Sequence, residues 1–375
     1  MMRFLLMPDS FKGTLTSAEI CAVMERALRA HFPTDDIFTL PIADGGEGTV
    51  DAFLTALGGE KRFIFVNGPF FEPVRAFYGL CGKTAVIETA SCAGLPLAHG
   101  RLDPCQTTTF GLGEILSAAL DEGAEKIILG LGGSCTNDGG AGMAAALGAR
   151  FLDASENEFV PTGGTLSDIA RIDGSGIDPR LQNCEIIAMC DVTNPLCGPN
   201  GASAVFAPQK GADANAVALL DQGLAHLASL LKRDCQTDVS ALPGAGAAGG
   251  LGAGCCAFLG ARLQSGISLM LNAVRFHEIC TPDSIVFTGE GKLDAQSLGG
   301  KAVSGIASAA AKHAAKVIAV AGGAENNLPK IYDAGITAVF TINRLPMAFE
   351  EAKRFSAENL FETMDNIARL LKIYA

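Results

Sequence analysis

Short apolar, β-branched runs, each ending in a polar or glycine-rich turn, alternate with segments of helical periodicity along this chain. The runs cover residues 3–7, 37–42, 126–131, 185–189, 284–287, 316–320 and 336–342. Runs that are apolar throughout are typical of strands covered on both faces of a parallel sheet. Helical patterns lie between many of them, at 17–30, 107–120, 214–231 and 357–372, and the first begins with a Thr16/Glu19 capping box. The sequence therefore predicts an α/β fold built on a doubly wound parallel sheet.

Residues 61–90 break this alternation, because strand-like runs there are separated by Asn-Gly-Pro and Cys-Gly-Lys turns with no helix between them. Such a pattern indicates an antiparallel meander. A chain of 375 residues also exceeds what one hydrophobic core usually organises. We therefore expect residues 1–61 plus 281–375 to form a doubly wound parallel-sheet domain, and residues 62–280 to form an inserted α/β domain with a mixed sheet. The runs near 126 and 185 are compatible with either domain.

The charge balance narrows the class of partner. The formal net charge is −12, from 28 Lys and Arg against 40 Asp and Glu, whereas nucleic acids and anionic membranes bind dense basic surfaces. We expect neither as a partner. No uninterrupted apolar stretch is long enough to span a bilayer and no secretory leader is recognisable, so we expect a soluble cytoplasmic protein. The 12 cysteines contain no CxxC pair, which favours reduced core residues and no structural zinc.

Acidic side chains follow several of the predicted strands. They are Asp9 after the first run, Asp44 after the second, Asp191 after the run at 185–189, and Glu290 with Asp294 after the run at 284–287. Polar residues at the carboxyl ends of parallel strands meet along one sheet edge, where ligands bind. Any one of these acids could instead cap a helix, but together their charges would repel one another. A divalent cation such as Mg²⁺, with water and phosphate oxygens, would relieve that repulsion.

Lysines and glycines occur in the same strand-end loops. The lysines are Lys12, Lys210, Lys292 and Lys301, and the most glycine-rich loop is GLGGSCTNDGG at 130–140. A strand that runs through glycines into a helix presents main-chain N–H groups to an anion. Acids for a metal ion, glycine amides for phosphate and lysines for developing negative charge are the groups that phosphoryl transfer needs. We therefore predict a kinase.

Other glycine motifs point elsewhere, but weakly. GAGAAG at 244–249 fits the dinucleotide pattern G-x-G-x-x-G, yet no convincing strand precedes it. GEGK at 289–292 is followed by Leu293, where a P-loop needs Ser or Thr. An NAD-dependent dehydrogenase and a non-catalytic small-molecule sensor are the lesser alternatives.

Five long motifs occur in a fixed order: MPDSFKGTLTS, PIADGGEGT, GLGGSCTNDGGAGMAAALGARF, CDVTNPLCGPNGASAVFAPQKGA and TGEGKLDAQSLGGK. Together they resemble the bacterial type I glycerate kinase family, the glycerate 2-kinases, over nearly the whole chain. The resemblance implies a flavodoxin-like domain with a second α/β domain. It also implies phosphorylation of D-glycerate to 2-phosphoglycerate by ATP with Mg²⁺, in glycolate, glyoxylate or glucarate catabolism. The residues themselves leave 3-phosphoglycerate open as the product, and leave open a homo-oligomer.

The motifs suggest a hypothesis for each site residue. We expect Mg²⁺ to be held by Asp191 with Glu290 or Asp294. We expect Asp44 to accept the proton of the substrate hydroxyl, while Lys12 and Lys292 pair with the glycerate carboxylate and the transferring phosphoryl group. The residues expected to bind the phosphates of ATP are Gly132, Gly133, Ser134, Thr136 and Asn137.

Overall fold

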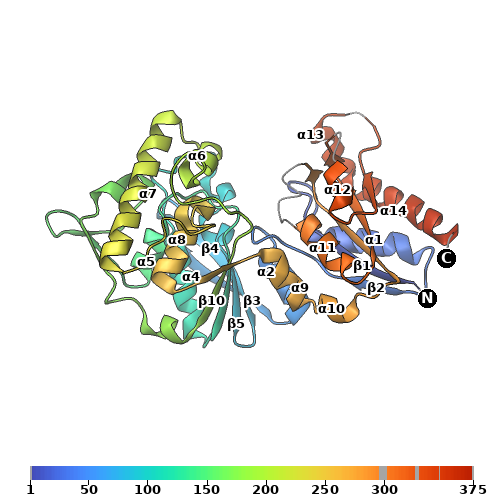
Figure 1. Cartoon of the computed structure of the whole chain (residues 1–375), viewed down its shortest axis with the longest axis horizontal. Coiled ribbons are helices and arrows are strands. Elements are labelled where there is room, and N and C mark those ends of the chain that lie inside the picture. The colour runs from blue at the N-terminus through green and yellow to red at the C-terminus, as the bar shows by residue number, and fades with distance from the viewer. Residues whose placement is uncertain (1, 295–301, 326–328, 346, 374–375) are drawn as a thin grey trace. The chain divides into compact units, whose positions relative to one another are not determined.

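The computed structural model describes residues 2–294, 302–325, 329–345 and 347–373, and the chain divides into two compact units (Figure 1). Unit 1 comprises Met1–Asp44, Asp51–Leu57 and Ser265–Ala375, and unit 2 comprises Gly45–Val50 and Gly58–Gln264. These limits differ from the expected boundaries at 61/62 and 280/281. One reason is that the segment at 266–273 is helical and packs against the helix at 302–311 of unit 1.

Unit 1 is built on a five-stranded, fully parallel sheet. The strand order reverses between its first and third strands along the chain, where Pro8 lies opposite Gly289. In open parallel sheets, the carboxyl ends of the strands at such a reversal border the ligand crevice. The strands are β1 (Arg3–Pro8), β2 (Asp36–Thr39), β12 (Ser284–Gly289), β14 (Lys316–Ala321) and β16 (Ala338–Thr341), in the order β16-β14-β12-β1-β2.

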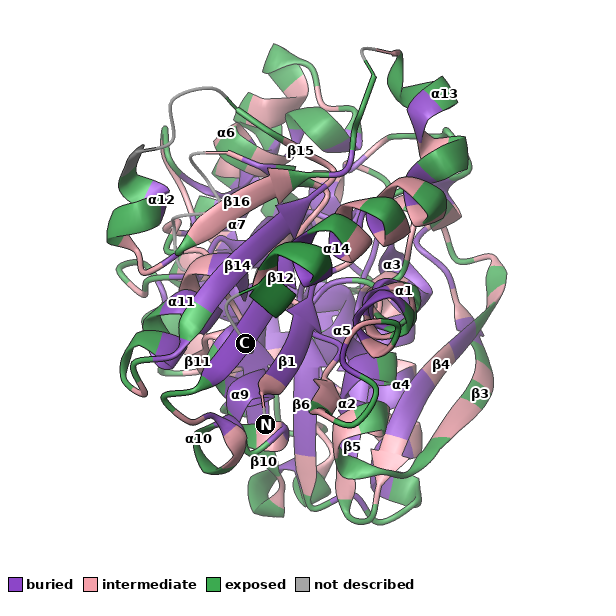
Figure 2. Ribbon diagram, turned by 90° about the vertical axis from the view of Figure 1, so that its right-hand side faces the viewer, coloured by how far each residue is buried: buried purple, intermediate pink, exposed green. Residues whose placement is uncertain are grey.

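The helices of unit 1 cover its sheet on both faces. They are α1 (Ser17–Arg29), α9 (Gly266–Ala273), α10 (Phe276–Ile279), α11 (Ala302–Ala311), α12 (Pro329–Asp333), α13 (Phe349–Ala352) and α14 (Ser356–Ile373). Phe4 and Leu6 of β1 pack in one cluster with α1 and α14. Leu5 and Met7 alternate to the opposite face and are equally buried, and α11, which takes no part in that cluster, packs against β12 and β14. The strands β1, β12 and β14 are accordingly buried along most of their length (Figure 2).

Unit 2 contains a six-stranded mixed sheet in the order β11-β10-β6-β5-β4-β3. Its strands are β3 (Glu60–Asn67), β4 (Pro73–Cys81), β5 (Thr84–Glu88), β6 (Lys126–Gly130), β10 (Glu185–Met189) and β11 (Arg262–Gln264). The first three pair antiparallel, which confirms the meander predicted at 61–90. The last four are parallel, so the runs near 126 and 185 belong to this sheet.

Helices and short strands complete the two units. In unit 2 the helices are α3 (Ala90–Ala93), α4 (Phe110–Asp121), α5 (Ala141–Ala146), α6 (Ala202–Phe206), α7 (Ala214–Asp234) and α8 (Ala247–Leu259), with the 3-10 turn η4 (Pro208–Lys210). Helix α2 (Thr49–Leu57) crosses the unit limits. A small sheet of β7 (Arg150–Leu152), β8 (Glu158–Phe159) and β9 (Arg171–Asp173) lies in unit 2, and β13 (Lys292–Leu293) pairs with β15 (Gly323–Ala324) in unit 1. No helix among the described residues combines the length and apolarity needed to cross a bilayer.

Candidate active-site residues

The glycine-rich loop of unit 2 follows β6 and leads into α5, as the sequence predicts. Glycines in this loop and in the segment packed on it are required by close packing of main chain on main chain. A Cβ atom on Gly132 would lie 2.8 Å from the Cα atom of Gly46. A Cβ atom on Gly249, at the start of α8, would lie 2.1 Å from the Thr136 carbonyl oxygen. The bare backbone therefore lets neighbouring segments approach the loop from two sides, before any ligand is considered.

A row of main-chain amides in this loop lacks an acceptor. The N–H groups of Gly133, Ser134, Thr136, Asn137 and Asp138 donate to no acceptor within the described part of the chain. Within the same described residues, the Thr136 hydroxyl oxygen and the Asn137 amide oxygen are buried without a hydrogen-bond partner. Because buried polar groups in native proteins are nearly always satisfied by protein, water or ligand, this cluster calls for a polar partner. Successive N–H groups of this kind are typical of anion sites.

Side chains from outside the loop fix its conformation. Lys210 Nζ donates to Ser134 Oγ at 3.1 Å and to the Thr136 carbonyl at 2.6 Å. Burial lowers the pKa of Lys210 to about 8. Asn137 Nδ2 donates to Ser203 Oγ at 3.2 Å. The loop is therefore held by the segment that contains α6 and η4.

Asp138 ties the same loop to two helices. Its carboxylate accepts hydrogen bonds from the N–H and hydroxyl of Thr109 at 2.7 and 2.8 Å, and from the N–H groups of Gly140 and Gly142 at 3.2 Å each. Complete burial raises the pKa of Asp138, while these hydrogen bonds act in the opposite direction. With its acceptor positions occupied in this way, Asp138 serves to hold the loop against the start of α4 and α5.

In unit 1, two acids follow the strands at which the sheet order reverses. Asp9 comes directly after β1 and Glu290 directly after β12, and the Asp9 N–H donates to the Gly289 carbonyl at 2.8 Å. Burial, followed by the negative charges of Asp44 and Glu290, raises the pKa of Asp9 to about 7. Carboxylates that repel one another at a sheet edge are one of the arrangements by which enzymes shift the pKa of an acid or base.

Asp44 and Lys12 also meet at this edge. Lys12 Nζ lies 3.8 Å from Asp44 Oδ2, and the side chains of Lys12 and Asp44 are 79% and 26% exposed. The negative charge of Asp44 raises the pKa of Lys12. The structure therefore brings together Asp9, Lys12, Asp44 and Glu290, the first of which the sequence places among the strand-end acids without a role of its own.

Lys292, Asp294 and Asp191 were also predicted for the site, and they lie on or just after other strands. Lys292, in β13, donates to Glu325 Oε1 at 2.7 Å, and this partner raises its pKa. Asp294 follows β13 and is half-buried. Asp191 follows β10 in unit 2, whereas Glu290 and Asp294 belong to unit 1, so their joint binding of one cation stays a prediction. Lys301 lies outside the described residues.

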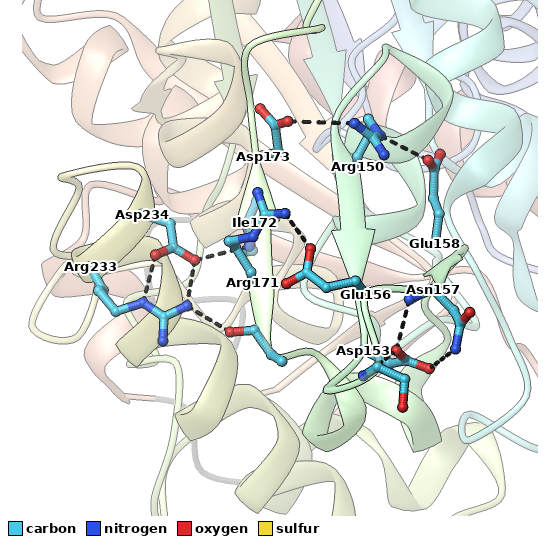
Figure 3. Close-up of polar contacts among 12 residues, drawn as sticks. Arg150, Asp153, Glu156, Asn157, Glu158, Arg171, Ile172, Asp173, Arg233 and Asp234 are labelled. Atoms are coloured by element: carbon cyan, nitrogen blue, oxygen red, sulfur yellow. Dashed lines mark hydrogen bonds and ion pairs between the residues drawn. The ribbon is translucent and has the colours of Figure 1, made fainter.

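A metal site or a cavity elsewhere within the described residues could also bind a ligand. Among them, no three His, Cys, Asp or Glu side chains are arranged to hold a metal ion. A cavity of about 400 Å³ in unit 2 is lined in part by Arg171, Asp173 and Asp234. Figure 3 shows that these charges are already matched, by Glu156, Arg150 and Arg233 respectively. It therefore offers no unmatched charge to a phosphate or carboxylate ligand.

The GAGAAG motif does not occupy a dinucleotide-binding position. It leads into α8, but β10 ends at Met189 and β11 begins only at Arg262, so no strand precedes it. Its Gly249 carbonyl instead accepts a hydrogen bond from the Gly139 N–H at 3.1 Å. The motif therefore supports the glycine-rich loop.

The sequence did not predict a specific contact for Lys210. It was visible in FAPQKGA as one more lysine beside a glycine, and lysines are usually solvated. Only the tertiary structure shows that its side chain is 2% exposed and reaches a loop far away in the sequence.

The chain is similar over its full length to known glycerate kinases. The model of the glycerate kinase family matches residues 4–372. Glycerate 2-kinase of Escherichia coli K12 is 44% identical over 375 residues, which cover 99% of this chain and 98% of that protein. Glycerate kinase of Bacillus subtilis 168 is 45% identical, with the same 99% and 98% coverage. A solved structure from Salmonella typhimurium LT2, described as glycerate kinase 2, matches with a TM-score of 0.87 at 43% identity, and covers 99% of this chain and 98% of that one.

Proposed function

Because this chain belongs to the glycerate kinase family and is a phosphotransferase, we propose that it transfers the terminal phosphoryl group of ATP to the 2-hydroxyl of D-glycerate. The observation that carries the proposal is the set of main-chain amides of Gly133, Ser134, Thr136, Asn137 and Asp138, which have no acceptor among the described residues. The similarity to the Escherichia coli enzyme named glycerate 2-kinase supports the 2-hydroxyl as acceptor. Phosphorylation at the 3-hydroxyl is the alternative outcome.

The glycine-rich loop would bind the nucleotide phosphates. Gly133 is exposed and Gly132 half-buried, so the main chain here is accessible to a ligand. Thr136 and Asn137 are completely buried as whole residues, so a phosphate would reach the Gly133 amide directly, and Thr136 and Asn137 would contribute from below the surface. Amides fixed in advance stabilise negative charge without reorganising during the reaction.

Asp44 would serve as the general base. The proton of the glycerate hydroxyl passes to its carboxylate, the freed oxygen bonds to the γ-phosphorus, and the bond from that phosphorus to ADP breaks. Lys12, 3.8 Å from Asp44 and highly exposed, would pair with the carboxylate of glycerate or with the transferring group. Lys292 would join it only after leaving Glu325.

The acids at the sheet edge of unit 1 fit a magnesium ion. The negative charges of Asp44 and Glu290 help to raise the pKa of Asp9, and Mg²⁺ prefers one or two carboxylates together with water and phosphate oxygens. We propose Glu290 or Asp294, with Asp191, as its protein ligands. The ion, when bound, would neutralise charge on the phosphate oxygens.

The wider setting belongs to the same proposal. A cytoplasmic location and a place in glycolate, glyoxylate or glucarate catabolism suit a small-molecule kinase, and the charge of −12 argues against nucleic acid as a partner. We also infer that unit 1 is a doubly wound, flavodoxin-like domain, which its strand order supports. Membership of a kinase family and the missing strand before residue 244 argue against the dehydrogenase alternative.

A steady-state assay tests the proposal. The purified protein is supplied with Mg-ATP and D-glycerate, and ADP release is compared with reactions that contain L-glycerate, no acceptor, or EDTA. We expect rapid ADP release only with Mg²⁺ and D-glycerate. Equal release without an acceptor would mean that the protein is an ATPase, and no release with any hydroxy acid would refute the proposal.

A further inference from the structure

Lys210 is a buried lysine that the proposed reaction does not use. It ends η4, its side chain is 2% exposed, and Nζ donates to Ser134 Oγ and to the Thr136 carbonyl. Both acceptors belong to the glycine-rich loop. The Lys210 side chain is directed into the protein, and its hydrogen bonds to the loop are its principal interaction.

The charge of Lys210 is not balanced by a bonded carboxylate. The titratable groups that face it are Cys135 and Asp138, and Asp138 directs its hydrogen bonds to Thr109, Gly140 and Gly142 instead. A buried ammonium group that bonds neutral acceptors is unfavourable for folding. Its presence therefore points to a role other than stability.

Lys210 and Ser203 act on the same loop from one short segment. Ser203, in α6, accepts from Asn137 Nδ2, while Lys210 bonds the two residues on either side of Cys135. We call Ser203 and Lys210 the loop clamp. Between and beside its contact points lie the amides of Gly133, Thr136 and Asp138 that donate to no acceptor among the described residues.

We propose that Lys210 is a positioning residue, which holds Ser134 and the Thr136 carbonyl so that the loop amides face the phosphates of the bound nucleotide. This inference rests on the proposed function, because it assigns the loop to the nucleotide. Lys210 need not touch the nucleotide. Its effect is to fix beforehand the donors that do.

The first test separates nucleotide binding from turnover. We would measure KM for ATP, KM for D-glycerate and kcat for Lys210→Met, Lys210→Arg and Ser203→Ala, with Lys232→Met as the control at an exposed lysine of the same unit. We expect KM for ATP to rise at least tenfold in Lys210→Met and a few-fold in Ser203→Ala. KM for D-glycerate and the control should stay within twofold of wild type, and Lys210→Arg should recover most of the loss.

The second test uses pH, because a merely structural contact would not shift a pH profile. Burial lowers the pKa of Lys210 to about 8 and raises the pKa of Cys135 to about 11, so of these two groups only Lys210 loses its proton between pH 7 and 9. The kcat/KM for ATP of the wild type should therefore fall above about pH 8. In Lys210→Arg that fall should move upward by at least one pH unit, because arginine keeps its charge.

The outcomes are decisive in either direction. A folded Lys210→Met protein with unchanged KM for ATP would overturn the proposal. If Lys210→Met does not fold, an alkaline fall at the same pH in wild type and Lys210→Arg would overturn it instead. Equilibrium titration of each variant with Mg-ATP gives a readout that needs no turnover, so a wild type without glycerate kinase activity would refute the proposed function while leaving the role of Lys210 measurable.

Discussion

Asp44 and Asp9 lie together at the carboxyl edge of one parallel sheet, yet their surroundings assign them different behaviour. Asp44 is partly exposed beside Lys12, whereas Asp9 is buried and its pKa is raised. A partly exposed carboxylate can reach a substrate, which favours Asp44 as the base. The charged form of Asp9 is instead disfavoured by burial and by neighbouring carboxylates, and a cation at this edge would stabilise it.

The role of Asp44 can be separated from a structural one. We expect Asp44→Asn to lower kcat by about 10² to 10⁴, the usual effect of removing a general base, with little change in melting temperature. Asp283→Asn, at an exposed acid of the same unit, is the control. An Asp44→Asn protein that melts lower but turns over normally would show that Asp44 is only structural.

The raised pKa of Asp9 predicts a pH-dependent stability. Because the folded pKa of about 7 lies above the ordinary value of 3.8, the folded state binds more protons between these values, and stability falls as pH rises from about 4 to 7. At pH 8 the free energy of unfolding of Asp9→Asn should therefore exceed that of the wild type by about 1 to 4 kcal/mol. Urea unfolding with EDTA at pH 4, 6 and 8 measures this difference. A difference that does not change with pH would contradict the ionisation of a strained Asp9.

At the scale of elements, the glycine-rich loop packs so closely on the start of α8 that position 249 has no room for a side chain. Gly249 has a φ of +71° and would place a Cβ atom 2.1 Å from the Thr136 carbonyl oxygen. Gly260, which ends the same helix at a φ of +64°, has nothing within 4 Å of its Cβ position. Alanine at either position would therefore be strained by the left-handed backbone, but only alanine at 249 would also clash with a neighbouring atom.

This pair gives a matched experiment. Gly260→Ala should destabilise the protein by about 1 kcal/mol, the cost of the left-handed conformation, and leave KM for ATP unchanged. Gly249→Ala should destabilise by about 1 to 3 kcal/mol more, because the added methyl group overpacks the contact, and should weaken ATP binding because the loop must move. Equal effects of the two substitutions on unfolding would mean that the contact is not tight in solution.

The sequence predicted elements better than contacts. The seven apolar runs each correspond to a strand, and α1 begins at the predicted capping box, where Thr16 accepts from the Glu19 N–H and the Thr16 N–H donates to Glu19. These signals are local, so they can be read from neighbouring residues. The three-residue strand β11 and the sheet of β7, β8 and β9 were missed, because segments of two or three residues have no readable periodicity.

The same distinction between local signals and long-range contacts applies to the candidate site. The strand-end acids and the glycine-rich loop follow from local patterns, and the acids of unit 1 do meet at one edge. The burial of Lys210, the bond between Asn137 and Ser203, and the packing of GAGAAG on the loop depend on residues far apart in the chain. No local pattern encodes them.

At the scale of the whole molecule, a protein with a net charge of −12 must bind an anionic nucleotide through local donors. Ligand binding to the folded state then stabilises the whole chain. We expect Mg-ATP at 100 times its Kd to add about 2.7 kcal/mol to the free energy of unfolding, and NAD at the same concentration to add nothing. Thermal unfolding with each ligand measures both effects. Stabilisation by NAD alone would instead support a dinucleotide enzyme.

The most direct test of the central claim is phosphorus NMR of the product formed from Mg-ATP and D-glycerate. We predict ADP together with one new phosphate ester whose signal is a doublet, because the phosphorus of 2-phosphoglycerate couples to the single proton on C2. A triplet would place the phosphate on the CH₂ group of C3 and contradict transfer to the 2-hydroxyl. The absence of any new ester would contradict glycerate phosphorylation itself.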